Sequence, residues 1–154
     1  TGVQTCALPT SGLPRFEDWY QDGRLQASIE YSESGAIMCQ SWYLNGLLHR
    51  EGDLPARIYY SETGAILSRS WYRNGIFHRD GDLPAWIKYN ESQLVVSQWW
   101  YRDGRLCRQG DGPACVDYYE SGIIKYESWY HDGRWHHMIC YHENGEIKER
   151  GQRM

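Results

Sequence analysis

One stretch of the sequence decides the fold: residues 70–85, which read Ser-Trp-Tyr-Arg-Asn-Gly-Ile-Phe-His-Arg-Asp-Gly-Asp-Leu-Pro-Ala. It is one copy of a unit that recurs along nearly the whole chain. Each copy begins with a Trp-Tyr pair, and the pairs are Trp19-Tyr20, Trp42-Tyr43, Trp71-Tyr72, Trp100-Tyr101 and Trp129-Tyr130. The last three intervals are 29 residues long and the first is 23. Such self-similarity predicts a repeat array.

Two turn signals in each copy indicate β-hairpins. An Asn-Gly or Asp-Gly dipeptide follows each Trp-Tyr pair, and this is the strongest short-range hairpin signal because Gly accepts positive φ. A second turn ends each copy, as in Ser61-Glu62-Thr63-Gly64, where a type I turn closed by a left-handed Gly fits. Gln93 stands in this Gly column in one copy, so we expect a strained or differently shaped turn there.

Period-two alternation between the turns predicts strands throughout. Ile66, Ser68 and Ser70 share one face of a strand, and Leu67 and Trp71 share the other. If the second turn is a three-residue loop, the Ala, Ile and Tyr columns join the face of Ile66 and Ser68, opposite the Trp column. The expected fold is all-β: an elongated, single-layer antiparallel β-meander of five hairpin repeats with about ten strands.

The ends of the array differ from its centre. The outer copies lack six residues that the central copies insert around Gly-Asp, and atypical end copies are what a repeat array needs. Residues 1–12 lie outside the repeat pattern and are interpreted as a non-native or disordered segment. Residues 13–154 are expected to form a single domain.

Composition restricts the classes of function. The net charge of −4 argues against binding a nucleic-acid duplex. Five scattered cysteines without a Cys-x-x-Cys pair fit reduced thiols in a cytoplasmic protein. No apolar run reaches the roughly 20 residues of a transmembrane helix. Arg outnumbers Lys thirteen to three beside eight Trp and thirteen Tyr, which favours stacking of guanidinium groups on aromatic rings.

The pattern Trp-x-x-x-Gly, then Gly-x-x-His, then a Tyr-x-x-x-Gly turn resembles MORN-type repeats and their bacterial and viral variants. The resemblance covers about residues 16–151, and the 23-residue outer copies match the usual repeat length of that family. The central copies depart from it through the insertion and through Arg50, Arg79 and Arg108. The resemblance implies a twisted sheet of hairpins without enzymatic activity that serves as a scaffold, an adaptor or an antitoxin-like module. A weaker resemblance to choline-binding cell-wall repeats is opposed by the 29-residue period.

Two columns of side chains could carry a function. The first holds His49, His78, Cys107 and the pair His136-His137, but equivalent residues in neighbouring copies should lie about 9–10 Å apart, too far to share one zinc ion. His136-His137 is interpreted as an exposed strand end. We therefore expect no metal and no cofactor. The second column pairs an arginine with an aspartate in each inserted loop: Arg50 with Asp53, Arg79 with Asp82, and Arg108 with Asp111. These pairs are either structural clamps inside each loop or a row of guanidinium groups offered to an anionic partner.

Three tryptophans, Trp86, Trp99 and Trp135, are extra to the repeat columns. They either fill surface or anchor a partner, since Trp and Arg dominate binding energies. The sequence thus predicts a non-catalytic binding module with an Arg- and aromatic-rich face, in a phage or bacterial setting. The ligand would be a compact, nucleotide-like anion. The alternative is a protein–protein or antitoxin-like module, and a homo-oligomer is compatible with either.

Overall fold

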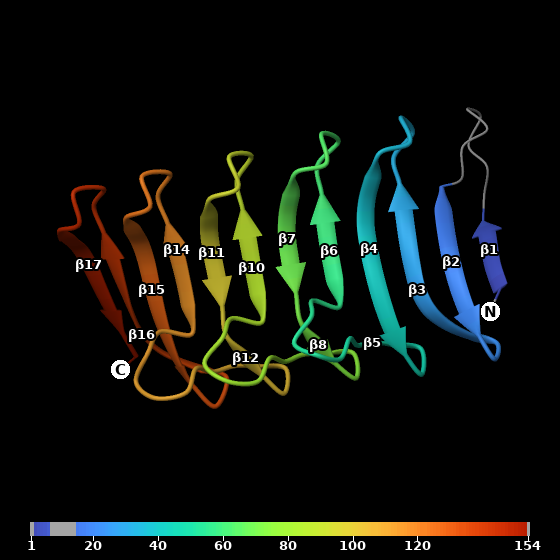
Figure 1. The fold of residues 1–154 in the computed structure, drawn as a ribbon. Helices are drawn as coiled ribbons and strands as arrows, with labels where there is room; N and C mark the ends of the chain where they lie inside the picture. The colour runs from blue at the N-terminus through green and yellow to red at the C-terminus, as the bar shows by residue number, and fades with distance from the viewer. Residues whose placement is uncertain (1, 7–14, 154) are drawn as a thin grey trace. The chain divides into compact units, whose positions relative to one another are not determined.

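The computed structural model describes residues 2–6 and 15–153 and divides the chain into two compact units, Thr1–Ile76 and Phe77–Met154. Both units consist of antiparallel strands and turns, and the described residues contain no helix. Figure 1 shows the hairpins of each unit following one another in chain order. The all-β hairpin meander expected from the sequence is therefore confirmed, and the single domain expected for residues 13–154 stays a prediction.

The first unit is a sheet with the order β1-β2-β3-β4-β6-β7, in which β5 also pairs with β4. Strand β1 pairs with β2 although residues 1–12 were expected to be non-native or disordered, and residues 7–12 lie outside the described ranges. Two short strands, β8 and β9, lead the chain towards the second unit. The bounds are β1 Gly2–Cys6, β2 Phe16–Gln21, β3 Arg24–Tyr31, β4 Ile37–Leu44, β5 Leu47–Leu48, β6 Arg57–Tyr60, β7 Ile66–Ser70, β8 Tyr72–Arg73 and β9 Ile76–Phe77.

The second unit is a sheet with the order β10-β11-β14-β15-β16-β17, beside a small hairpin of β12 and β13. The strand predicted to run through Trp100 is split into β11 and β12, because Trp100 donates its backbone N–H to Ala114 and accepts one from Cys107. The bounds are β10 Trp86–Tyr89, β11 Val95–Trp99, β12 Tyr101–Arg102, β13 Arg105–Leu106, β14 Cys115–Tyr118, β15 Ile124–His131, β16 Arg134–Tyr141 and β17 Ile147–Gln152.

The turns have the geometry that their sequences predict. In all five Asn-Gly or Asp-Gly dipeptides that follow a Trp-Tyr pair, both residues have positive φ, between 48° and 52° for Asn or Asp and between 73° and 82° for Gly, as a type I′ turn requires. The Gly residues of the second turns are also left-handed, for example Gly64 at 81° and Gly122 at 82°. Gln93 adopts φ of 61° in the same position, which confirms the expected strain.

Replacing Gln93 by glycine should raise the free energy of unfolding by about 1 kcal/mol, because a side chain in the left-handed region carries a steric cost that glycine lacks. Urea denaturation followed by circular dichroism measures this change. The matched control is Gly122→Gln, which puts the same strain into the equivalent turn and should lower stability by a similar amount. An unchanged stability of Gln93→Gly would mean that the bond from Gln93 Nε2 to the Asn90 carbonyl, 3.3 Å, offsets the strain.

The prediction of which columns share a face is wrong, and a β-bulge is the reason. Tyr60 pairs with Ile66 as expected, but Tyr59 pairs with Ser68 and Ile58 with Arg69, so Leu67 is an extra residue on β7. A one-residue slip moves the rest of a strand to the other face. Ile58 therefore lies on the same face as Arg69 and the Trp column, which we call the tryptophan face.

A ladder of tyrosine hydroxyls holds the tryptophan face together. In each case the hydroxyl donates to a side chain on the preceding strand of the sheet: Tyr31 to Glu17 (3.0 Å), Tyr60 to Gln40 (2.7 Å), Tyr118 to Gln98 (2.8 Å) and Tyr141 to Glu127 (2.6 Å). The bond to the Glu127 carboxylate raises the pKa of Tyr141 to about 12. The sequence separation is 14 residues in the short copies and 20 in the long ones, so the six-residue insertion leaves the ladder intact.

Small residues form the buried centre of both units. Ala56, Ala85 and Ala114 have no exposed surface, and Trp42 donates its backbone N–H to the Ala56 carbonyl at 2.9 Å. The opposite face buries serines, among them Ser41 and Ser70 in the first unit and Ser97 and Ser128 in the second. Large aromatic rings can thus lie close over the backbone, because the alanines leave room for them.

Candidate functional site

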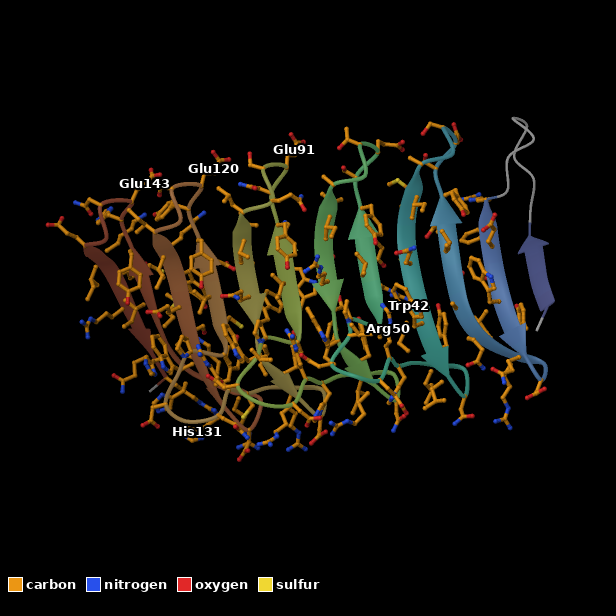
Figure 2. The ribbon with its side chains drawn as sticks, viewed as in Figure 1. Trp42, Arg50, Glu91, Glu120, His131 and Glu143 are labelled. Atoms are coloured by element: carbon orange, nitrogen blue, oxygen red, sulfur yellow. The ribbon has the colours of Figure 1, made fainter. Side chains whose placement is uncertain are left out.

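The arginines of the predicted row hold the inserted loops. The guanidinium of Arg50 lies 3.7 Å from the ring centre of Trp42, and the two side chains are seen together in Figure 2. Arg50 also donates to the Pro55 carbonyl at 3.4 Å, and burial lowers the pKa of its guanidinium. Arg79 reaches the carbonyl of Pro84 at 3.1 Å. Both arginines thus tie their own loops closed.

Arg108 forms the strongest of these clamps. Its guanidinium lies 4.1 Å from the ring centre of Trp100 and donates to both carboxylate oxygens of Asp82, with N–O distances of 2.9, 2.9 and 3.1 Å. These bonds lower the pKa of the Asp82 carboxyl. The partner aspartate lies one repeat earlier, 26 residues away, so the predicted pairing within a loop is wrong here. Arg79 and Arg108 line a shared hollow of about 20 Å³, which has room for a water molecule but for no larger ligand.

The predicted histidines also hold turns in place. His49 Nδ1 accepts the backbone N–H of Asn74 at 3.2 Å. The side chain of His78 is 4 % exposed, and its two ring nitrogens lie 2.8 Å from Asp103 Oδ1 and 3.0 Å from Asp80 Oδ1. Hydrogen bonds of this kind fix one hairpin against the next.

Backbone carbonyls of the predicted aspartates accept indole N–H groups. Trp71 Nε1 donates to Asp53 at 3.1 Å, Trp100 Nε1 to Asp82 at 3.4 Å, and Trp129 Nε1 to Asp111 at 2.9 Å. The extra tryptophans Trp86 and Trp99 pack together on the serine-bearing face, with ring centres 5.0 Å apart. The eight predicted Arg, His and Asp residues therefore hold loops and turns in place, whereas Trp86 and Trp99 pack on the sheet.

A basic cleft in the second unit was not predicted from the sequence, although Trp135, one of its lining residues, was singled out as a possible anchor. It is a hollow of about 630 Å³ lined by Arg105, His131, Asp132, Arg134, Trp135, His136 and Arg153, which we call the basic cleft. Its three guanidinium groups come from β13, from β16 and from the segment after β17, and one carboxylate stands among them. In Figure 2, His131 marks this end of the unit, away from Glu91, Glu120 and Glu143 in the second turns. The cleft therefore concentrates positive charge in a protein whose net charge is negative.

Local structure explains how the cleft is assembled. Asp132 and Gly133 form the type I′ turn between β15 and β16, which places Arg134 opposite His131. A Cβ on Gly133 would lie 3.2 Å from the Cβ of Arg105, so the missing side chain gives Arg105 its place above the turn. The backbone N–H of Arg153 donates to the His136 carbonyl at 3.0 Å and fixes the third arginine beside β16.

Histidine rings border the cleft. His131 and His136 meet edge to face with ring centres 6.1 Å apart, and the Nδ1 atoms of His136 and His137 are 2.7 Å apart. His137 stacks on Trp129 at 4.3 Å. Burial, followed by the charge of His136, lowers the pKa of His137. The neutral form of His137 is thereby favoured, and it can accept from or donate to its neighbour.

A hollow of about 470 Å³ in the first unit is lined by three tyrosines, Glu30 and Glu33 with a single arginine, so it lacks the positive charge of the basic cleft. Cys39, Cys107, Cys115 and Cys140 are free thiols, and burial raises the pKa of Cys115 to about 12, which keeps it protonated and unreactive. Across the described ranges, no three His, Cys, Asp or Glu side chains are placed to share a metal ion.

No helix within the described residues has the length and apolar character to cross a bilayer. No protein-family model matches the chain, and no curated protein matches it.

Proposed function

We propose that the chain is a non-catalytic repeat module that binds a compact anionic ligand in the basic cleft. The observation that carries the proposal is the convergence of Arg105, Arg134 and Arg153 on one hollow with a single carboxylate, Asp132. Guanidinium groups fork onto phosphate or carboxylate oxygens with charge-assisted hydrogen bonds, which are about twice as strong as neutral ones. The resemblance to MORN-type repeats, whose members bind without catalysing reactions, supports the same reading.

Size and charge both favour a small ligand. A volume of about 630 Å³ lies in the range of small-molecule sites. The second turns of the same unit carry Glu91, Glu120 and Glu143, so positive charge does not continue along the sheet. A long polyanion would need a continuous basic surface, whereas a compact anion needs only the cleft.

Isothermal titration calorimetry with inorganic pyrophosphate tests the proposal. Arg134→Gln and Arg153→Gln should each weaken binding by about tenfold or more, because a hydrogen bond to a charged group contributes about 1.5–3 kcal/mol. The matched control is Arg24→Gln, which alters the equivalent hairpin turn of the first unit and should leave the affinity unchanged. There, Arg24 donates to Asn45 Oδ1 at 2.8 Å and is the one arginine lining its hollow.

Two results would contradict the proposal. One is the absence of pyrophosphate binding at millimolar concentration and low salt. The other is an equal loss of affinity in Arg24→Gln and Arg134→Gln, since binding would then reflect general positive charge instead of the cleft.

A protein-binding role is the second candidate function. Leu94 and Ile123 follow the second turns of neighbouring hairpins in the second unit and are 52 % and 37 % exposed. The first unit has Ala36 and Ala65 in the corresponding positions, so the fold does not require large apolar groups there. Native mass spectrometry of freshly purified protein separates the two functions, because a bound polypeptide would favour this role and a small-molecule adduct would favour anion binding.

A further inference from the structure

The first and last hairpins of the array share one backbone design. Both have a type I′ Asp-Gly turn, at residues 22–23 and 132–133. Both also carry a bulge at the same place: Trp19 pairs with Ala27 and Tyr20 with Leu25, as Trp129 pairs with His137 and Tyr130 with Trp135. Comparing the two hairpins therefore shows which side chains this backbone requires and which it does not.

The side chains after the turn differ sharply between these hairpins. The first reads Arg24-Leu25-Gln26-Ala27, and the last reads Arg134-Trp135-His136-His137. Since the first hairpin folds with Leu, Gln and Ala, the backbone does not require Trp or His at these positions. The bulge brings the rings of His136 and His137 to the same side, with centres 5.0 Å apart.

The cleft thus adds aromatic rings to its guanidinium groups. Trp135, His131 and His136 line it together with the three arginines. Trp135 is only partly exposed, whereas all three arginines are exposed, so the ring forms the wall and the charges form the rim. A planar heterocycle can stack on such rings while its anionic groups meet the arginines.

We infer that the ligand of the basic cleft is a nucleoside phosphate, whose base stacks on Trp135 while Arg105, Arg134 and Arg153 hold its phosphates. This inference rests on the proposed anion-binding function and adds a stacking contact between the base and Trp135. The base contact contributes affinity that an inorganic phosphate chain of equal charge does not receive.

Calorimetric titration with ATP and with inorganic triphosphate tests the inference, because the two compounds carry the same number of phosphates. ATP should bind about tenfold more tightly than triphosphate. Trp135→Leu should bring the affinity for ATP down to that for triphosphate and leave the latter unchanged. Leucine occupies the same position in the first hairpin, so this variant should keep the fold, which circular dichroism verifies. The control Leu25→Trp should leave both affinities unchanged.

The outcomes separate the two claims. Equal affinities for ATP and triphosphate, or an equal loss of both in Trp135→Leu, would overturn the base contact and leave anion binding standing. If neither ATP nor triphosphate binds, both the anion-binding function and the base contact are overturned. Tighter binding of a single-stranded oligonucleotide than of ATP would also overturn the inference, since the cleft would then serve a polymer.

Discussion

Replacing Trp100 by alanine is expected to lower the free energy of unfolding by about 3–5 kcal/mol. Trp100 is 6 % exposed, and its ring lies under the guanidinium of Arg108. Its backbone N–H bonds to Ala114 at 2.8 Å, so the residue stands where the inserted loop leaves the sheet. Because alanines fill the space beneath the rings, no larger side chain can move in to close the cavity.

Urea denaturation followed by circular dichroism measures the effect, and Trp135→Leu is the control. Trp135 lines the basic cleft, and the first hairpin folds with a leucine at its position, so its replacement should change stability little. Domains of this size have total stabilities of about 5–15 kcal/mol, so Trp100→Ala should be partly unfolded at moderate temperature. Equal stabilities of the two variants would show that the Trp column does not hold the sheet.

The hairpins and turns could be predicted because their chemistry is local. Asn-Gly and Asp-Gly dipeptides accept positive φ at both positions. The strain at Gln93 could be predicted because this residue stands where the other copies have glycine. Which face each column occupies could not be predicted, because the extra residue Leu67 inside β7 has no sequence mark that sets it apart. The bulge becomes visible only from the pairing of two strands.

The basic cleft escaped prediction because its arginines are far apart in sequence and lie outside the inserted loops. One signal was present. The residue after the Asn-Gly or Asp-Gly turn is Arg24 in the first copy, Leu47 or Ile76 in the next two, and Arg105 and Arg134, one repeat of 29 residues apart, in the last two. Cations at one position of two neighbouring copies indicate a local concentration of positive charge, which the isolated Arg24 does not give.

The sequence left the role of the arginine row open because Arg beside Trp fits two physical roles equally well. A guanidinium that stacks on an aromatic ring and binds an aspartate stabilises the fold. A guanidinium that is exposed at the rim of a cleft can bind an anion instead. The deciding observation is a contact between neighbouring repeats: Arg108 binds Asp82, which lies 26 residues earlier in the sequence. Spacing within one loop could not reveal this partner.

Replacing Arg108 by alanine is expected to lower the free energy of unfolding by about 2 kcal/mol and to leave pyrophosphate binding unchanged. Its stack on Trp100 contributes about 1 kcal/mol, as a partly desolvated cation–π contact. Its ion pair adds at most about 1 kcal/mol, because Asp82 is 46 % exposed and solvent screens the charges. Asp82→Asn should therefore cost less than Arg108→Ala, since it keeps the stack.

The matched control is Arg105→Gln, a change of another arginine only three residues away. Arg105 lines the basic cleft, so this variant should keep its stability and lose affinity for pyrophosphate by about tenfold. Urea denaturation and calorimetry of both variants therefore give opposite patterns if Arg108 is a clamp and Arg105 a ligand-binding group. Loss of pyrophosphate binding in Arg108→Ala at full stability would instead make the inserted loops the binding surface, because a clamp cannot be removed without weakening the fold it holds.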